Sequence, residues 1–90
     1  MKLSQLKYFI SICNNITITA AAESLHVSQP SLSIAIRELE QEFDVSLFFR
    51  NKKKLILTKE GEYFLKCAME IVDRTDALIE KMKDFGRGKP

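Results

Sequence analysis

The chain has 90 residues, of which 46% are hydrophobic and 29% are charged, with three glycines and two prolines. This composition excludes a disordered or repetitive chain and predicts one small, mostly helical domain. The formal net charge of +2 does not by itself indicate nucleic acid, and no stretch approaches the roughly 18 apolar residues that a membrane span needs.

The first two predicted elements are short helices. From about residue 4 to residue 14, apolar residues recur at helical spacing: Leu3, Leu6, Phe9, Ile10 and Cys13. Two asparagines end this stretch, and either Thr17 or Thr19 can cap a second helix. The second helix places two alanines and Leu25 toward the core, and such small residues let a neighbouring helix approach closely.

A third helix follows after a three-residue connection, which is the spacing of a helix-turn-helix. Ser28 is a suitable N-cap, and Pro30 falls in the first turn, where its missing N–H group costs nothing. The helix runs to about residue 43 and carries one apolar stripe, made of Leu32, Ala35, Ile36, Leu39 and Phe43. Its opposite face is mostly polar, with Ile34 as the exception.

Residues 47–57 predict a β-hairpin with a basic tip, which is the wing of a winged helix-turn-helix. Short runs of aromatic and β-favouring residues flank a polar turn. The tip carries four cations, Arg50, Lys52, Lys53 and Lys54. No acidic residue lies between positions 44 and 60, so we expect a positive surface suited to phosphate or minor-groove contact, although a solvated charge run is the alternative.

A long helix is predicted over residues 59–85, with Thr58 as its cap. It would reach about 40 Å, which is longer than a small domain can cover, so its far half must pack on something else. A second copy of the chain is the simplest candidate. The residues expected in that interface are Leu65, Ala68, Val72, Ile79 and Met82. Residues 86–90 stop the helix and begin a linker.

Neither cysteine nor histidine has the spacing of a metal, redox or catalytic site. Cys13 and Cys67 lie far apart, so we expect free, buried thiols in a reducing cytoplasm. His26 has no second ligand or base nearby in the sequence and is expected to close the turn. The start of the chain lacks the pattern of a secretory signal. We therefore expect a cytoplasmic protein with no enzymatic activity.

The whole pattern up to about residue 85 resembles the N-terminal domain of LysR-type transcriptional regulators. The matching residues are Leu6 and Phe9, then Thr19-x-Ala21-Ala22, then Leu25-His26-Val27-Ser28-Gln29-Pro30, then Leu32-Ser33-x-x-Ile36-Arg37-x-Leu39-Glu40, then Leu47-Phe48-x-Arg50, and finally Leu57-Thr58-x-x-Gly61. This chain departs from the family pattern at Ile34, a position that is often basic.

The resemblance implies a mostly α fold with three parts. Residues 1–58 would form a winged helix-turn-helix of three helices and a two-stranded β-wing, and residues 59–85 a dimerisation helix. Residues 86–90 would begin a hinge to an effector-binding domain that senses a small molecule and is missing here, so we expect a DNA-binding piece of a longer regulator. No cofactor is expected in this piece. The expected partners are double-stranded DNA and a second copy, or a tetramer in a longer protein.

The expected DNA contacts fall on the third helix, the start of the second helix and the wing. On the third helix they are Ser28, Gln29, Pro30, Ser31, Ser33, Ile34 and Arg37, and elsewhere Thr17, Thr19, Arg50, Lys52, Lys53 and Lys54. The Gln29 amide can bond adenine, or simply cap the helix. Ser33 and Arg37 can reach phosphate, although a salt bridge of Arg37 to Glu40 is the alternative.

Ile34 leaves two interpretations open: packing against thymine methyl groups, or one exposed hydrophobic residue of the ordinary kind. Two classes of function also remain. The first is a dimer whose third helices read inverted half-sites in the major groove. The second is a protein-interaction module that pairs through the long helix and binds DNA weakly, without sequence preference.

Overall fold

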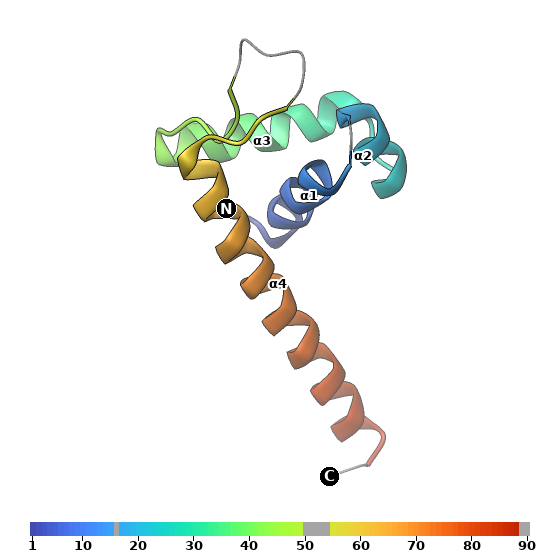
Figure 1. Ribbon diagram of the computed structural model, residues 1–90. Coiled ribbons are helices and arrows are strands. Elements are labelled where there is room, and N and C mark those ends of the chain that lie inside the picture. Colours follow the sequence, from blue (N-terminus) through green and yellow to red (C-terminus); the bar gives the residue numbers. More distant parts are fainter. Residues whose placement is uncertain (16, 50–54, 89–90) are drawn as a thin grey trace.

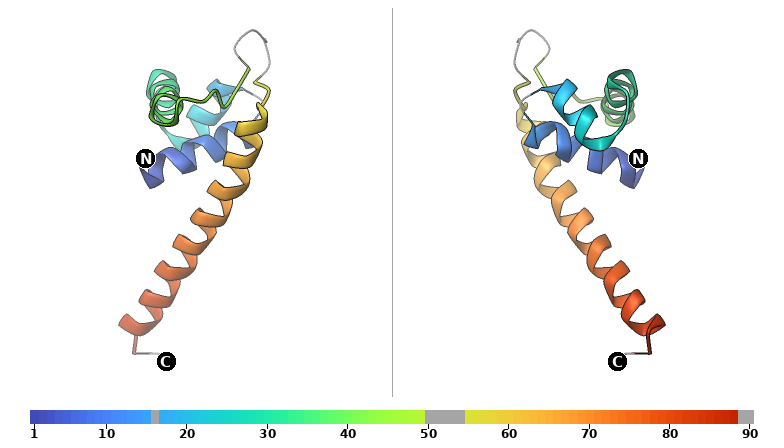
Figure 2. Two further views of the ribbon diagram at one scale, coloured as in Figure 1. Left: turned by 90° about the vertical axis from the view of Figure 1, so that its left-hand side faces the viewer. Right: turned by 90° about the vertical axis from the view of Figure 1, so that its right-hand side faces the viewer.

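The computed structural model describes residues 1–15, 17–49 and 55–88 (Figure 1). These described parts contain four helices: α1 (Leu3–Asn14), α2 (Ile18–Leu25), α3 (Gln29–Phe43) and α4 (Lys59–Gly86). The first three pack into a small head, and α4 starts in the head and then projects away from it (Figures 1 and 2). The result is an elongated molecule of 53 × 25 × 19 Å.

Hydroxyl side chains start three of the helices, as the sequence predicts. Thr17 Oγ1 accepts a hydrogen bond from Ala20 N at 3.0 Å, so Thr17 and not Thr19 caps α2. Ser28 Oγ accepts from Ser31 N at 3.1 Å at the start of α3. Thr58 Oγ1 accepts from Gly61 N at 2.9 Å at the start of α4. Each cap satisfies an N–H group that the first helical turn leaves without a partner.

The connection between α2 and α3 is tight because one residue adopts the left-handed conformation. His26 has φ 58° and ψ 41° and ends α2. This lets Val27 N donate to Ala22 O at 3.0 Å, which closes the helix end in the manner of a Schellman motif. The histidine therefore has the turn-closing position that the sequence predicts.

The core lies where α1, α3, α4 and the segment after α3 meet. Phe9, Leu32, Leu39 and Leu47 are its largest fully buried side chains. The ring of Phe9 lies 5.3 Å from that of Phe48 and 4.9 Å from that of Phe64, in an edge-to-face arrangement with the latter. Aromatic rings in this geometry add to the burial energy. Two fully covered alanines, Ala21 and Ala22, bring α2 against this core.

One residue of the predicted α3 stripe is misplaced. Phe43 was expected in the core, yet it is 45% exposed. It lies in the last turn of α3, where the helix reaches the edge of the head, and its ring centre is 6.5 Å from that of Phe64. The expectation of Phe43 in the core is therefore wrong, because the apolar stripe of α3 continues beyond the residues of the head that could cover it.

The two-stranded β-wing is not observed. In the described residues no strand is present, and Phe48 and Leu57 form a single isolated antiparallel bridge. Phe49 N donates to Ile56 O at 2.9 Å on one side of the bridge, and Thr58 N donates to Leu47 O at 3.0 Å on the other. Pairing this short does not make a strand ladder. The predicted basic tip, residues 50–54, lies outside the described residues.

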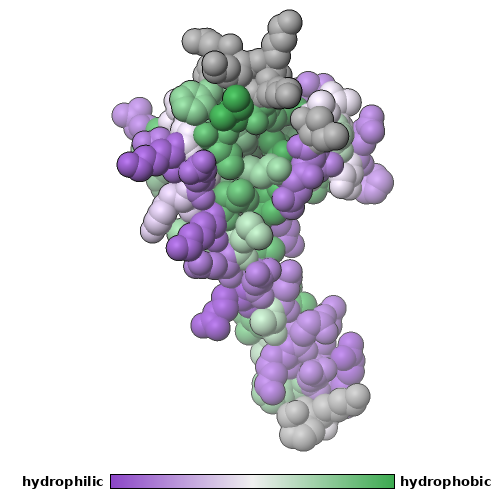
Figure 3. All heavy atoms as spheres, viewed as in Figure 1, coloured by the Kyte–Doolittle hydropathy of each residue, from purple (hydrophilic) through white to green (hydrophobic). Residues whose placement is uncertain are grey.

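Both cysteines are free thiols and half-buried. Burial raises the pKa of the Cys13 thiol to about 11. Cys13 lines a hollow of about 320 Å³ between α1, the pair of segments around the bridge and the first turns of α4. Seen from the side of Figure 1, apolar residues gather in the middle of the head, whereas α4 is largely hydrophilic with apolar patches (Figure 3). No helix in the described part of the chain is long and apolar enough to cross a membrane.

Candidate nucleic-acid interface

Helix α3 has two chemically opposite faces, and this amphipathic character defines the candidate interface. The face toward the head is buried and apolar, with Leu32, Ile36 and Leu39. The opposite face exposes Gln29, Pro30, Ser31, Ile34 and Arg37 to solvent. Because the apolar face fixes the helix, the exposed face is presented on a rigid support rather than on a loop.

The beginning of α3 lies beside the beginning of α2. Thr19 Oγ1 donates a hydrogen bond to Gln29 Oε1 at 3.4 Å, and both residues are exposed. Ser28 Oγ donates to Ser31 Oγ at 2.7 Å and also accepts from the Ser31 amide. The Ser31 hydroxyl thus belongs to the cap. Thr17, the cap of α2, is exposed as well, so two helix N-termini and their polar side chains share one surface, which suits an anion.

Two further candidate residues lie on the side of α3 that faces the isolated bridge. Half-buried Ser33 and exposed Arg37 line a hollow of about 130 Å³ together with Ile18 of α2 and Leu55. The ion pairs formed among the described residues do not include Arg37. The expected alternative, a salt bridge between Arg37 and Glu40, is not among these ion pairs of the described residues.

Buried Glu40 fixes the segment that leads into the predicted wing, a role that the sequence did not reveal. Glu40 is 7% exposed, and its Oε2 atom accepts a hydrogen bond from Leu47 N at 2.7 Å. The sequence placed Glu40 only in the family pattern and as a possible salt-bridge partner of Arg37. A glutamate one turn after Ile36, beside the apolar stripe, is the signal that could have found it.

The same segment is held from the other side by the start of α4. Thr58 Oγ1 donates to Ser46 O at 2.5 Å while it caps the helix. Gly61 lies so close that a Cβ atom built on it would come 2.1 Å from Leu47 O. We call residues 46–48 the clamped segment, because Glu40 of α3 and Thr58 and Gly61 of α4 hold it between two helices. This clamp sets where the predicted wing leaves the head.

The four expected wing cations, Arg50, Lys52, Lys53 and Lys54, lie outside the described residues. The described residues next to them are apolar and exposed: Phe49 is 50% exposed and Ile56 is 44% exposed.

The residues expected in a dimer interface divide into two groups along α4. Ala68 is 1% exposed and so is covered within one chain, and Leu65 is half-buried and packs against the core. The reason is that the first turns of α4 belong to the head. Val72 is half-buried, and Ile79 and Met82 in the projecting half are exposed. The candidates for a dimer surface are therefore the residues beyond Ala68, namely Val72, Ile79 and Met82.

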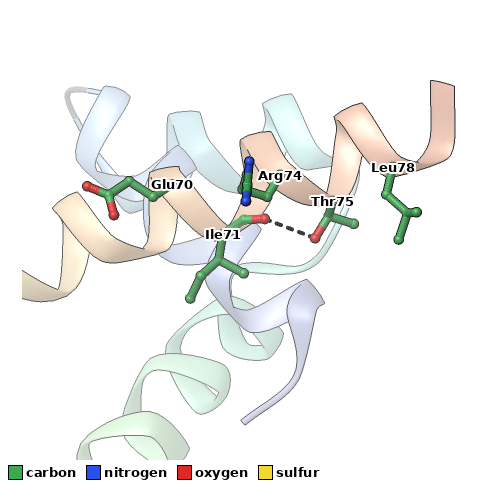
Figure 4. A pocket seen from close by; sticks show the side chains of 5 residues that line it. All are labelled: Glu70, Ile71, Arg74, Thr75 and Leu78. Atoms are coloured by element: carbon green, nitrogen blue, oxygen red, sulfur yellow. Dashed lines mark hydrogen bonds between the residues drawn. The ribbon is translucent and has the colours of Figure 1, made fainter. Parts of the chain in front are cut away.

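The projecting half of α4 also carries a shallow groove. It is lined by Glu70, Ile71, Arg74, Thr75 and Leu78 and has a volume of about 420 Å³ (Figure 4). Thr75 Oγ1 donates to Ile71 O at 2.9 Å, which turns the hydroxyl back onto the helix. Leu78 is 61% exposed. A helix face with this much exposed apolar surface is expected to meet a partner.

The comparison with protein families decides what kind of domain this is. Residues 3–62, from the start of α1 to the first turn of α4, match the family described as bacterial regulatory helix-turn-helix protein, lysR family. The chain belongs to the LysR family. The match includes both helices of the helix-turn-helix and the clamped segment, so the chain contains the regulatory helix-turn-helix domain of this family.

Two similar bacterial regulators support this assignment. The LysR-family chain is 52% identical over 82 residues to the HTH-type transcriptional regulator BsdA of Bacillus subtilis (strain 168), covering 89% of this chain and 28% of BsdA. It is 45% identical over 76 residues to the Hca operon transcriptional activator HcaR of Escherichia coli (strain K12), covering 84% of this chain and 26% of HcaR. The chain thus spans about a quarter of the length of these two regulators.

Solved structures are similar over nearly the whole chain. The crystal structure of the BenM_DBD/catB site 1 DNA complex superposes with a TM-score of 0.93 at 31% identity, covering 98% of this chain and 95% of that one. Full-length BenM gives a TM-score of 0.87 at 31% identity over 92% of this chain and 27% of that one. The LysR-family domain and its projecting α4 therefore have the same arrangement as in these structures.

Proposed function

We propose that this LysR-family domain recognises a specific DNA site by inserting the start of α3 into the major groove. The observation that carries the proposal is the division of α3 into a buried apolar face and an exposed polar face. The exposed face begins at a helix N-terminus and holds an amide, hydroxyls and one guanidinium. These are the groups that bond base edges and phosphates in the major groove.

Each exposed group has a role in this proposal. Gln29 bonds an adenine edge, with its oxygen oriented by the Thr19 hydroxyl. Thr17 and Thr19 contact the backbone at the start of α2, and Ser28 and Ser31 do so at the start of α3. Pro30 lies close to a sugar or a thymine methyl. Ser33 and Arg37, which line the hollow on the side of the bridge, contact phosphate where the groove turns toward the wing.

We further propose that residues 46–58 act as a wing. The clamped segment and the Phe48–Leu57 bridge support this role, since they fix to the head the two segments that flank the basic sequence. The four cations, Arg50, Lys52, Lys53 and Lys54, would contact phosphate or the minor groove. Such contacts add affinity for any sequence and little discrimination, because phosphates are the same at every step.

Two copies are proposed to pair through α4. The helix has 28 residues and is about 42 Å long, so roughly half of it extends past the head. Val72, Ile79 and Met82 carry its apolar surface there, joined by Leu78 and Phe85. A two-fold dimer presents two α3 helices to one duplex and therefore reads inverted half-sites, spaced by whole helical turns of about 34–36 Å.

The longer protein would be a cytoplasmic regulator with a separate effector-binding domain. Relatives about four times as long support this, since BsdA and HcaR are named as transcriptional regulators. In such a protein the domain described here would select the DNA site, and a small molecule bound to the other domain would regulate the protein bound there. No enzymatic step is assigned to the domain.

Selection of bound sequences from a random DNA pool tests the proposal. The expected result is enrichment of an inverted repeat, with competition by the selected site at least about a hundredfold better than by random DNA, given typical specificity ratios. Gln29→Ala should lower this ratio, whereas Ser33→Ala should weaken binding to selected and random DNA by similar factors. If no sequence is enriched while the chain still dimerises, the domain is a protein-interaction module and the proposal is wrong.

A further inference from the structure

Ile34 is the one large apolar side chain in the middle of the exposed face of α3. It is 51% exposed. Phe43, the other exposed apolar residue of the helix, lies in the last turn and contacts Phe64. At 100° per residue, Ile34 lies about 160° from Ile36 of the buried face and about 40° from Pro30. The side chain is therefore directed away from the core, next to the residues proposed to enter the groove.

A single exposed isoleucine needs no special explanation on an ordinary surface. The position of Ile34 nevertheless indicates a function, because Pro30 and Arg37 lie on the same face, one turn before and one turn after it. Any duplex that contacts both residues also covers Ile34. The side chain has no hydrogen-bonding atom, so at a base edge it can interact favourably only with apolar surface. In the major groove that surface is the C5-methyl group of thymine.

We propose that Ile34 is a specificity-determining residue that selects thymine at one position of each half-site through its methyl group. This inference rests on the proposed insertion of α3 into the major groove. It predicts an energy of methyl burial and no hydrogen bond to that base. Transfer of one methylene-sized group from water to an apolar contact corresponds to about a fourfold change in affinity.

Deoxyuridine substitution tests the inference directly, since uracil is thymine without the methyl group. The site obtained by selection is prepared with each thymine of one half-site replaced in turn by uracil. Dissociation constants are then measured for the parent chain and for Ile34→Ala. At one position the parent should lose about fourfold on methyl removal, and Ile34→Ala should lose less than about half of that factor. Ile34→Val, which keeps a branched apolar side chain, should retain the methyl preference.

Gln41→Ala is the matched control, because Gln41 is an exposed residue of the same helix, two turns beyond Ile34, with no proposed DNA contact. It should leave every methyl effect as in the parent. The inference is overturned if Ile34→Ala and the parent show the same methyl effect at every thymine, whatever the overall affinity of the variant. If selection yields no enriched site at all, the proposed function has failed and not only this inference.

A substitution with an opposite chemistry gives a second, independent test. Arginine bonds O6 and N7 of guanine bidentately, so Ile34→Arg should shift the preferred base at the same position from thymine to guanine. A repeated selection with this variant reports the shift. An unchanged preference at that position would show that residue 34 does not contact the base edge, and would also overturn the inference.

Discussion

Gly61 of α4 lies against the carbonyl oxygen of Leu47, so closely that a Cβ atom on residue 61 would come 2.1 Å from that oxygen and 3.0 Å from the carbonyl carbon. A glycine in the first turn of a helix thus sets the distance between α4 and the clamped segment. The contact joins the helix proposed to pair two copies to the segment that carries the wing. In the proposed dimer, this contact therefore links the distance between the two heads to the position of each wing.

Gly61→Ala should destabilise the fold. The added methyl group meets backbone atoms and not a flexible side chain, so α4 or the clamped segment must move, at a cost of about 1–3 kcal/mol. Urea unfolding followed by circular dichroism measures this. Gly86→Ala is the matched control, because a Cβ atom there meets nothing within 4 Å. Equal stability of the two variants would contradict the described contact.

Glu40→Ala should also lower stability, because the Leu47 amide loses its buried acceptor at 2.7 Å. An unsatisfied buried N–H group costs about 1–3 kcal/mol. Since the clamped segment is released, affinity for non-specific DNA should fall as well. The control is Glu38→Ala, which removes an equal charge from an exposed position of the same helix. If Glu38→Ala lowers both quantities equally, charge and not the clamp is responsible.

The wing cations should act on affinity and not on sequence choice. Lys52→Ala combined with Lys53→Ala should weaken binding to selected and random DNA by similar factors. The slope of log K against log salt should become shallower by about 0.9 for each phosphate contact removed. Titrations at several salt concentrations measure this. A loss confined to the selected sequence would show that the tip reads bases.

Dimerisation should depend on the projecting half of α4. Leu78→Glu introduces a charge on a side chain that is 61% exposed and lines the apolar groove (Figure 4). It should turn a dimer into a monomer in sedimentation experiments without unfolding the head. Ala77→Glu adds the same charge to an exposed position that lies about 100° around the helix from Leu78 and about 140–160° from Val72, Ile79 and Met82. Dissociation by both variants alike would argue against pairing along this face.

The Cys13 thiol makes stability depend on alkaline pH. Its pKa rises from 9.0 to about 11 because burial disfavours the thiolate. The folded chain therefore holds this proton more tightly than the unfolded chain. The contribution is complete below pH 9 and is lost as pH rises toward 11. Unfolding of the parent and of Cys13→Ala at about pH 8 and about pH 10.5 measures it. The parent should lose more stability than the variant across this interval, and parallel losses would exclude the thiol as the cause.

The sequence predicted those features that depend on neighbouring residues. Thr17, Ser28 and Thr58 were identified as possible caps because a cap bonds an N–H group only three residues away. The apolar stripe of α3 was likewise visible as a helical period, and Ile34 was placed correctly on the exposed face.

Features that depend on tertiary partners were not predicted. Glu40 is seven residues from the amide that it holds, and nothing in its local pattern names Leu47 as the partner. Ala68 fitted the stripe of the long helix, but whether that stripe faces α1 or another chain depends on where the head ends. A two-stranded wing is not seen among the described residues, where the pairing is limited to the Phe48–Leu57 bridge, and hydrophobic runs predict pairing without fixing its length.

The central claim is that the exposed start of α3 discriminates between DNA sequences. Competition of selected against random DNA for the parent and for Gln29→Ala tests it most directly. The account predicts that the variant stays folded and dimeric, keeps its affinity for random DNA within about threefold, and loses at least about tenfold in preference for the selected site, as one lost bidentate base contact implies. An unchanged preference in a folded Gln29→Ala variant would contradict the account.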